Sequence, residues 1–489
     1  MATQQTRREF LENSMFAAAA AAVAGSAMVP QFQPAVRAAG ANERIGMAVI
    51  GMRGRGGEHI SEWVKHYPEC EITAICDIDD GVLGKSVERI EKASGKKPEG
   101  YRDIRKLLED KSVDAVSIAT PNHWHSLAAI WAIQAGKDVY VEKPVSHNVS
   151  EGRRVVEAAR KHEKICQTGT QCRSMKGTID AIEFVKAGKI GEVKLARGLC
   201  YKPRGSIGPK GNYEVPAGID YDLWSGPAPV KPLTRKQFHY DWHWQWDYGN
   251  GDLGNQGIHQ MDIARWGLGV DTLGENVLSY GGRLSYEDAG ETANTQVNIH
   301  DYGDKTLVFE VRGLKTSDYK GANVGVIFHG SEGYVVLTSY TGGAAFDLDG
   351  KMTTKFSGNG DHFGNFLKAV RSRKQTDLAA DILEGHLSSA LCHLGNISYR
   401  LGKQMSFPTA KEALAGNKVK DEAVQTFDRV TQHLADNKVD LAQTQLQFGA
   451  MLSLVSGGEM FRGQGSEQAN TMLTREYRAP FVVPATKDL

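Results

Sequence analysis

The sequence has 489 residues, 41% of them hydrophobic, which is long enough for two domains with additional segments. Its 58 Lys and Arg residues balance 58 Asp and Glu residues, so we expect no nucleic-acid partner, which would need a net basic surface. None of the six cysteines belongs to a C-x-x-C pair, which argues against a zinc knuckle and a dense disulfide framework.

The first 38 residues resemble a twin-arginine export signal. The stretch "TRREFLE" (6–12) places paired arginines before apolar residues, and an Ala-rich segment too short to span a bilayer follows. Val36 and Ala38 offer small residues for a cleavage site. We therefore expect removal of residues 1–38, a periplasmic or otherwise exported protein with no membrane span in its mature chain, and a tightly held cofactor. An ordinary amphipathic leader is the alternative.

Residues 44–168 alternate strand and helix patterns. Strands are expected at 46–51, 71–77, 113–120, 137–143 and 164–169, with helices at about 57–66, 81–93, 102–110, 125–136 and 149–162. Apolar strands that alternate with helices indicate a parallel sheet covered on both faces, which is a Rossmann-type, doubly wound α/β domain. Such a sheet binds its ligand at the carboxyl ends of its strands.

The first strand ends in the glycine turn "GMRGRG" (51–56). Gly51, Gly54 and Gly56 would let the backbone approach a pyrophosphate at a helix N-terminus. Arg53 stands where G-x-G-x-x-G has its middle glycine, so its side chain either adds a donor to the pyrophosphate or faces solvent. Arg53 and Arg55 are therefore included among the predicted cofactor-binding residues.

Two further strand ends carry groups suited to a dinucleotide. Asp77 ends the second strand, where an acid can accept both ribose hydroxyls of an adenosine and repel a 2′-phosphate, so NAD is favoured over NADP. The third strand ends in "TPNHWH" (120–125), whose side chains can contact a nicotinamide ribose. The candidates in this turn are Thr120, Pro121, Asn122 and His125.

The stretch "VEKPV" (141–145) follows the next strand and contains the candidate catalytic lysine. Lys143 is expected to project into the cleft of the nicotinamide, with Glu142 beside it. A partly desolvated lysine has a lowered pKa and can hydrogen-bond a ribose hydroxyl and a substrate hydroxyl. The bond between Lys143 and Pro144 is a candidate cis peptide.

Together, "AVIGMRGRG", "CDID", "TPNHWHS" and "VEKPVS" resemble the Gfo/Idh/MocA oxidoreductases, and the resemblance covers about residues 45–405. It implies NAD(P)-dependent oxidation or reduction of a sugar or polyol carbon, with Lys143 in the site. It also implies a C-terminal domain whose open sheet often forms a subunit interface. We therefore expect a homo-oligomer that associates through this sheet.

The second domain is expected over residues 169–405. Alternating apolar and polar residues predict the strands of a large, mainly antiparallel open sheet in an α+β domain, at 193–201, 276–286, 292–302, 305–313, 323–330 and 332–340. Helices at about 361–372 and 380–402 follow. Residues 406–489 are interpreted as a helical C-terminal extension.

Residues 238–266 contain the candidate substrate-binding aromatics. Trp242, Trp244 and Trp246 alternate with polar residues, so in an extended chain their indoles would share one face and could contact a sugar ring. A structural aromatic plug is the alternative. His239 and His243 are four residues apart but are not expected in a helix, so we predict no metal site.

"GDLGNQGIHQMDIARW" (251–266) predicts a helix with Asn255, His259 and Asp262 on one face. In the resembled family a helix here supplies a histidine as the proton-transfer partner of the substrate hydroxyl, and His259 matches it. The family often has an acid four residues earlier, where this chain has Asn255, so Asp262 is expected to orient the imidazole. A structural histidine is the alternative.

These residues predict an exported NAD(P)-dependent oxidoreductase acting on a sugar or polyol hydroxyl, with its cofactor recycled in place. His259, assisted by Lys143, removes the hydroxyl proton, and Tyr201 and Arg204 help to line the sugar pocket. One alternative is an NAD-dependent glycoside hydrolase that works by transient oxidation and elimination. A second is a redox-inert sugar-binding protein.

Overall fold

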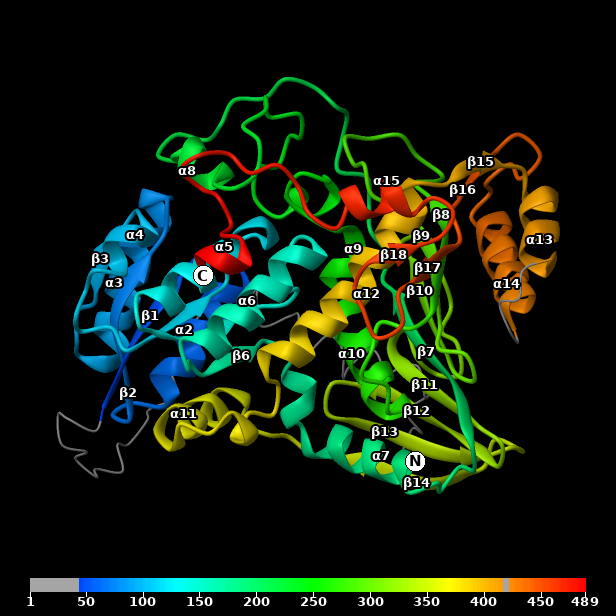
Figure 1. The fold of residues 1–489 in the computed structure, drawn as a ribbon, viewed down its shortest axis with the longest axis horizontal. Helices are drawn as coiled ribbons and strands as arrows, with labels where there is room; N and C mark the ends of the chain where they lie inside the picture. The colour runs from blue at the N-terminus through cyan, green and yellow to red at the C-terminus, as the bar shows by residue number, and fades with distance from the viewer. Residues whose placement is uncertain (1–43, 417–421) are drawn as a thin grey trace, which may run out of the picture. The chain divides into compact units, whose positions relative to one another are not determined.

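A computed structural model of the protein describes residues 44–416 and 422–489, so the predicted signal segment 1–38 lies outside the described residues. Two sheets organise the described part of the chain, and the labels in Figure 1 locate their strands. Within this part of the chain, no helix combines the length and the apolar character that crossing a membrane requires.

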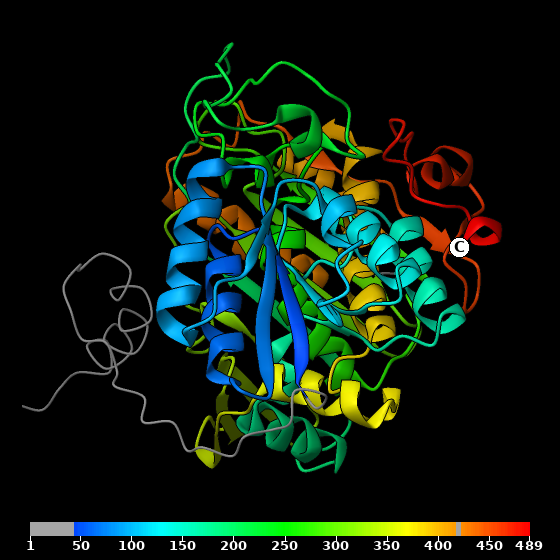
Figure 2. The ribbon, with the colours of Figure 1, turned by 90° about the vertical axis from the view of Figure 1, so that its left-hand side faces the viewer.

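The first sheet, as described, has six parallel strands in the order β3-β2-β1-β4-β5-β6. The strands are β1 (Ile45–Ile50), β2 (Cys70–Cys76), β3 (Glu99–Tyr101), β4 (Ala115–Ile118), β5 (Asp138–Val141) and β6 (Cys166–Thr168). The helices that connect them are α2 (Arg55–Lys65), α3 (Asp80–Ser94), α4 (Ile104–Leu107), α5 (Asn122–Gln134) and α6 (Val149–Lys161). Figure 2 shows helices on both sides of these strands. The predicted Rossmann domain is confirmed.

Strand β1 shows why this sheet is covered on both faces. Ala48 and Ile50 pack into a core with α5 and α6, whereas Met47 and Val49 pack into a second core that contains Trp63 of α2. Successive side chains of a strand point to opposite faces, so an unbroken apolar run needs helices on each side. The apolar sequence of β1 therefore specifies a central strand.

The second sheet, over the described residues, runs in the order β14-β13-β12-β11-β7-β10-β9-β8-β16-β15. Its strands are β7 (Val193–Tyr201), β8 (Asn276–Gly282), β9 (Thr295–Asp301), β10 (Thr306–Arg312), β11 (Val324–Gly330), β12 (Gly333–Ser339), β13 (Gly342–Asp347), β14 (Met352–Ser357), β15 (Lys403–Met405) and β16 (Leu446–Phe448). Strands β17 (Leu452–Leu454) and β18 (Phe461–Arg462) extend from β8. Strands β7 and β10 pair in parallel, and the other pairs are antiparallel, so the predicted α+β domain with a large, mainly antiparallel sheet is confirmed.

Helices cover one face of the second sheet and also reach the first domain. α7 (Lys176–Lys186), α10 (Gly257–Leu268) and α12 (Ile382–Arg400) share a core with the inward residues of β7, β10 and β11. α11 (His362–Ser372) packs with α2 instead, and α12 contacts α6. The short helices of this region are α8 (Tyr221–Ser225), α9 (Gly251–Asn255), η3 (Gln171–Ser174), η4 (Asp241–Trp244) and η5 (Gln375–Asp377).

The chain itself covers part of the opposite face of the second sheet. α13 (Phe407–Gly416) and α14 (Ala423–Asp436) pack Phe407 and Phe427 against outward residues of β8, β9 and β10. Strands β11 to β13 carry outward aromatic residues that are only partly buried, such as Tyr334 and Phe346. The association of subunits through this sheet stays a prediction. The outward face of β11 to β13 is the part of the sheet that remains for a subunit contact.

The C-terminal extension is helical only in part, which corrects the sequence-based interpretation. After α14 it contributes β16 to β18 and α15 (Ser466–Thr471), and a segment with little regular structure then leads to η6 (Thr486–Asp488). In Figure 1 this red segment runs from α15 past α8 to α5. Phe481 packs edge-on against Trp124 of α5, with ring centroids 5.5 Å apart. Short apolar patches such as "FVVP" show no helical or strand period in the sequence. Their apolar character reflects packing on a domain that is far away in the sequence.

Replacing Phe481 with alanine should lower the free energy of unfolding by roughly 3 kcal/mol, because truncating a buried aromatic residue removes apolar contacts and leaves a cavity. Phe481 is 2% exposed, whereas the neighbouring Val482 is 47% exposed. Val482→Ala is therefore the matched control and should change stability by less than about 0.5 kcal/mol. Urea unfolding followed by tryptophan fluorescence measures both. Equal effects of the two substitutions would contradict this packing.

Candidate functional site

A cavity of about 490 Å³ lies at the carboxyl ends of β1, β2, β4 and β5, and we call it the cofactor cavity. Parallel strands gather the residues that follow them at one edge of the sheet, which is why positions distant in sequence meet there. Of the predicted residues, the following line it: Gly51, Arg53, Gly54, Arg55, Asp77, Thr120, Pro121, Asn122, His125, Glu142, Lys143, Trp242 and Asn255.

The glycine turn is required by backbone crowding. A Cβ on Gly51, which has φ +80°, would lie 2.9 Å from the carbonyl oxygen of Ala119, and one on Gly56 would lie 1.8 Å from the carbonyl oxygen of Gly51. Gly56 thus allows α2 to begin close against β1, and it does so without lining the cavity. Arg53 forms an ion pair with Asp79, the N-cap residue of α3, so its guanidinium is held toward the end of β2.

Asp77 is fixed by two backbone donors at the end of β2. Its Oδ2 accepts from the amide of Met52 at 2.9 Å, and its Oδ1 accepts from the amide of Asp79 at 3.1 Å. Burial raises the pKa of Asp77 above its ordinary value. Each carboxylate oxygen keeps a second lone pair, so the group can still accept a ribose hydroxyl.

The cavity fits a dinucleotide. Thr120 Oγ1 is buried and has no hydrogen-bond partner among the described residues, although Thr120 lines the cavity. A bound polar ligand would satisfy such a hydroxyl, which otherwise carries a desolvation cost. Gly51 and Gly56 leave room where a Cβ would collide, and Asp77 presents an acceptor at the second strand. The glycine turn therefore suits a pyrophosphate, and the carboxylate of Asp77 and the hydroxyl of Thr120 suit the polar groups of the riboses.

Glu142 anchors the end of β5 to the glycine turn. Its Oε1 accepts from Arg55 Nε at 2.7 Å and from His59 Nε2 at 3.0 Å. Burial alone would raise the pKa of Glu142, but the positive charge of Arg55 and the hydrogen bond from His59 outweigh it and hold the pKa well below its ordinary value. The buried carboxylate of Glu142 and the half-buried guanidinium of Arg55 thus form an ion pair that fixes the backbone at Lys143.

Lys143 connects the two domains. Its Nζ donates to the carbonyl oxygen of Asn255 at 2.9 Å, and its peptide bond to Pro144 is cis, as predicted. Burial lowers the pKa of Lys143. The ammonium form is therefore less favoured than in a solvent-exposed lysine, and the amine is available to accept a proton at a lower pH.

The predicted helix over 251–266 is interrupted. α9 ends at Asn255 and α10 begins at Gly257, with Gln256 between them. Because of the interruption, the carbonyl of Asn255 accepts from Lys143 and is not used in the backbone hydrogen bonds of a continuous helix. Gln256 Nε2 donates to Tyr340 Oη at 2.9 Å, so this break contacts the turn that follows β12. The amphipathic pattern alone did not indicate the break.

His259 lies in α10, behind Asn255, and is 3% exposed. Its ring centroid is 4.9 Å from that of Tyr340, and its Nδ1 has no hydrogen-bond partner among the described residues. Burial and then the charge of Lys143 hold the pKa of His259 well below its ordinary value. The imidazole is therefore neutral near pH 7.

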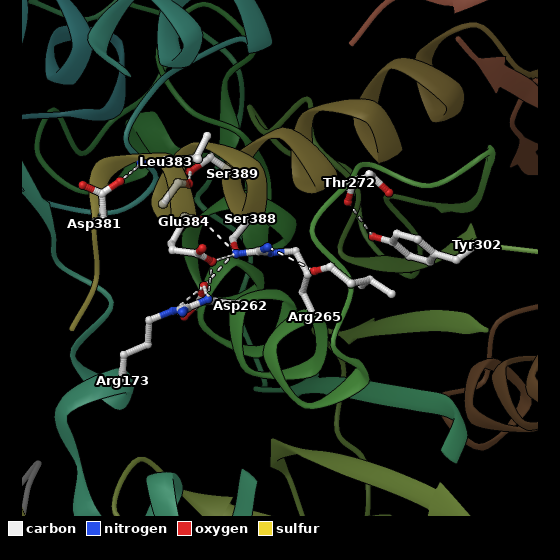
Figure 3. Close-up of polar contacts among 12 residues, drawn as sticks. Arg173, Asp262, Arg265, Thr272, Tyr302, Asp381, Leu383, Glu384, Ser388 and Ser389 are labelled. Carbon is white, nitrogen blue, oxygen red and sulfur yellow. Dashed lines mark hydrogen bonds and ion pairs between the residues drawn. The ribbon is translucent and has the colours of Figure 1, made fainter. Parts of the chain in front are cut away.

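Asp262 does not orient His259, which corrects the prediction. Arg173 Nε donates to Asp262 Oδ2 at 2.8 Å, and Ser388 Oγ donates to Oδ1 at 2.8 Å. Glu384 joins Arg173 to Arg265, as Figure 3 shows. These contacts join α10 to η3 and α12. Asp262 thus holds the helix that carries His259 rather than the imidazole itself.

The three tryptophans do not share a face, because residues 241–244 form η4 instead of an extended chain. Trp242 lines the cofactor cavity. Trp244 lines a separate cavity, with the guanidinium of Arg204 5.2 Å from its ring. Trp246 lines another cavity, of about 730 Å³, with the guanidinium of Arg400 5.0 Å from its ring.

The structure does not bring Tyr201 and Arg204 to the cofactor cavity. Tyr201 Oη donates to Glu310 Oε2 at 2.7 Å, on the outward face of the second sheet. Arg204 Nη2 donates to Asp252 Oδ1 at 2.7 Å. Tyr201 follows the alternation of β7, which turns it away from the α10 side of the sheet.

Two histidines are among the residues that sequence reasoning missed as parts of this cavity. His243 lines it, stacked on Trp242 with ring centroids 3.6 Å apart, and His239 lines it 3.7 Å from Asp79. Burial lowers the pKa of His243 to about 3, so its ring is neutral. The only sequence signal was their aromatic surroundings, because the segment reaches the cavity through a tertiary loop.

Two family models match the chain. The one described as the oxidoreductase family, NAD-binding Rossmann fold, matches residues 45–170, and the one described as the oxidoreductase family, C-terminal alpha/beta domain, matches residues 208–434. Together they match the greater part of the sequence. The chain belongs to the Gfo/Idh/MocA oxidoreductase family, and its first domain is an NAD-binding Rossmann domain.

The curated relatives match over less than a third of this chain. The alpha-N-acetylgalactosaminidase of Shewanella oneidensis is 30% identical over 155 residues, which are 31% of this chain and 34% of the relative. A glycosyl hydrolase family 109 protein of Shewanella baltica is 32% identical over 148 residues, which are 29% of this chain and 32% of the relative. The match thus spans about a third of the length of these relatives.

Solved structures share the fold over most of the chain. The WlbA dehydrogenase of Bordetella pertussis, solved with NADH and UDP-GlcNAcA, has a TM-score of 0.54 at 19% identity and covers 71% of this chain and 94% of its own. GenD2 from gentamicin A biosynthesis, solved with NAD, has a TM-score of 0.51 at 19% identity. The match covers 75% of this chain and 95% of GenD2. At these identities the likeness shows the fold alone.

Replacing Asp77 with alanine should weaken NAD binding roughly tenfold or more, because a ribose hydroxyl loses a charged acceptor. NADP should lose less affinity, because the repulsion of its 2′-phosphate disappears, so the preference for NAD should shrink. Asp103→Ala is the matched control, because Asp103 lines the same cavity but caps α4 and accepts from Arg105. Calorimetric titration with both dinucleotides measures the ratio of the affinity for NAD to the affinity for NADP. An unchanged ratio in the Asp77 variant would contradict the assignment.

Proposed function

We propose that the protein is an NAD-dependent oxidoreductase that oxidises a hydroxyl-bearing carbon of a sugar or polyol. The observation that carries the proposal is the position of Lys143. It lines the same cavity as the glycine turn and Asp77, and its Nζ reaches Asn255 of the second domain. A base on the wall of a dinucleotide cavity is suited to take the proton of an alcohol.

The residues of this chain prepare the proton transfer. The carbonyl of Asn255 can only accept, so it orients one N–H of Lys143 and leaves the remaining positions of the nitrogen for a substrate hydroxyl. When NAD is bound, its nicotinamide supplies the acceptor for the hydride from the alcohol carbon. Lys143 takes the hydroxyl proton, and His259, which is buried in α10 and does not line the cavity, stays neutral.

The aromatic pair Trp242 and His243 closes the cavity on the side of the second domain. Its stacked rings line the cavity and present an apolar face, which suits the C–H face of a sugar. Apolar walls also exclude water, and this strengthens the electrostatic interactions of Lys143 with its substrate.

Lys143→Met should abolish the reduction of NAD by a sugar or polyol and leave NAD binding within about twofold, because the glycine turn and Asp77 remain. The matched control is Lys202→Met, since Lys202 is exposed and adds a positive charge near Lys143 without lining the cavity. Nicotinamide absorbance during a screen of sugars and polyols measures turnover. Normal turnover in the Lys143 variant would refute the proposal.

The pH dependence of kcat/KM should report the protonation of the Lys143 amine. Because burial lowers the pKa of Lys143, its neutral form appears below the ordinary pKa of lysine, and kcat/KM for oxidation should rise with pH through the lowered value and then level off. An arginine stays protonated over this range, so Lys143→Arg should lack this rise. A rise that persists unchanged in Lys143→Arg would assign it to another group.

A second candidate function is a glycoside hydrolase that oxidises a sugar carbon transiently, eliminates the aglycone and restores the carbon. The names of the curated relatives, an alpha-N-acetylgalactosaminidase and glycosyl hydrolase family 109 proteins, favour it. Cleavage of a chromogenic N-acetylgalactosaminide without added cofactor or acceptor would select this function. A protein that binds sugar but holds no dinucleotide would instead be a redox-inert binding protein.

We further propose that the protein is exported in folded form with its NAD retained. All six cysteines fall in the described residues, where each is buried and forms no disulfide, as suits a chain that folds in a reducing compartment. Mass analysis of the ligand released on denaturation tests retention. Fractionation of cells that express an Arg7→Lys, Arg8→Lys variant tests export, and a periplasmic location of this variant would refute the twin-arginine route.

A further inference from the structure

A second cavity, of about 730 Å³, lies outside the site described above. Its walls come from the loop after Pro144, residues 229–231, the segment around Trp246, the C-terminal half of α12 and the C-terminal segment 471–478. In Figure 1 this segment follows the red α15. The cavity is thus formed by parts of the chain more than 300 residues apart, and the C-terminal extension completes it.

Asparagines separate the second cavity from the cofactor cavity. Asn122, which lines the cofactor cavity, donates through Nδ2 to Asn250 Oδ1 at 3.1 Å. Asn250 lines the second cavity, donates to the carbonyl of His147 at 3.1 Å and accepts through its own carbonyl from Asn396 Nδ2 at 3.0 Å. These buried contacts form a wall between the two cavities, which share no lining residue.

One basic side chain of the second cavity, Arg400, differs from the other three. Those three pair with carboxylates: Lys231 with Asp247 at 2.7 Å, Arg475 with Glu151 at 3.5 Å and Arg478 with Asp222 at 2.6 Å. Arg400 has no carboxylate within ion-pair distance among the described residues, and its guanidinium lies 5.0 Å from the ring centre of Trp246. A cation left without an anion beside an aromatic face is suited to a negatively charged, ring-shaped ligand.

Unpartnered buried polar atoms give an independent indication of a ligand. Arg475 Nη2 has no hydrogen-bond partner among the described residues, although its Nη1 donates to the carbonyl of Asp247 at 2.9 Å. His147 Nε2 and His393 Nδ1 are also buried and unpartnered in the described part of the chain, and both residues line the cavity. His393 is 4% exposed. Buried polar atoms of native proteins usually have partners, so these atoms indicate a polar ligand.

We propose that the second cavity binds a sugar that carries a carboxylate or sulfate group. Arg400 and Arg475 bind the anion, Trp246 contacts the ring, and the neutral imidazoles and asparagine amides bind hydroxyls. The site lies behind the wall of asparagines, so its ligand does not compete with NAD. This proposal does not rest on the proposed reaction, since it concerns binding alone.

Calorimetric titration of the full-length protein, with NAD at saturation, tests the proposal. Glucuronate and glucose 6-sulfate are the two anionic probes, and glucose is the neutral one. At least one anionic probe should bind about tenfold tighter than glucose, as a charge-assisted hydrogen bond allows. The anionic probe that binds more tightly shows whether the site prefers a carboxylate or a sulfate group. Equal binding of all three, binding of none, or displacement of the anionic probe by NAD would overturn the proposal.

Two variants locate the binding. Arg400→Gln should reduce the preference for the anionic probe about tenfold, and Trp246→Leu should weaken all sugars because it removes the ring contact. Arg462→Gln is the matched control, since Arg462 is an exposed arginine of β18 that does not line the cavity. Both cavity variants should bind NAD as the wild type does, which shows that they fold. Unchanged anion binding in Arg400→Gln would overturn the proposal.

Discussion

The hydrogen bond from Lys143 Nζ to the carbonyl of Asn255 is the contact on which the site depends. It joins the end of β5 in the first domain to the end of α9 in the second. The end of β5 is held in place, because Glu142 beside Lys143 is bonded by Arg55 and His59. The position of the amine is therefore set by both domains, and burial between them lowers its pKa.

Buried ion pairs hold the elements that carry these groups. Asp262 is fully buried and bonded by Arg173, and removing one partner of such a pair costs about 3–5 kcal/mol because a charge is left without compensation. The pair joins η3, which follows the last strand of the first domain, to α10, which carries His259. Charges that add little net stability thus fix the relative position of the two halves of the site.

The aromatic segment and the C-terminal extension divide the space above the first domain into separate cavities. η4 turns Trp242 toward the cofactor cavity and Trp244 away from it, and the chain then carries Trp246 to the second cavity. The last residues of the chain pack Phe481 against Trp124, whose other side lines the cofactor cavity. The extension therefore supports the wall of one cavity and completes the other.

The sequence by itself determined the two sheet-based domains and the cofactor half of the site. The first strand ends in a turn with no room for a Cβ at Gly51 or Gly56, and Asp77 and Lys143 follow strands whose carboxyl ends meet at one edge of a parallel sheet. Only the tertiary structure decided what Asp262, Trp244 and Tyr201 do. Their partners are Arg173, Arg204 and Glu310, and each lies on another element. Helical or alternating spacing gives the face of an element, but the packing of other segments decides what that face meets.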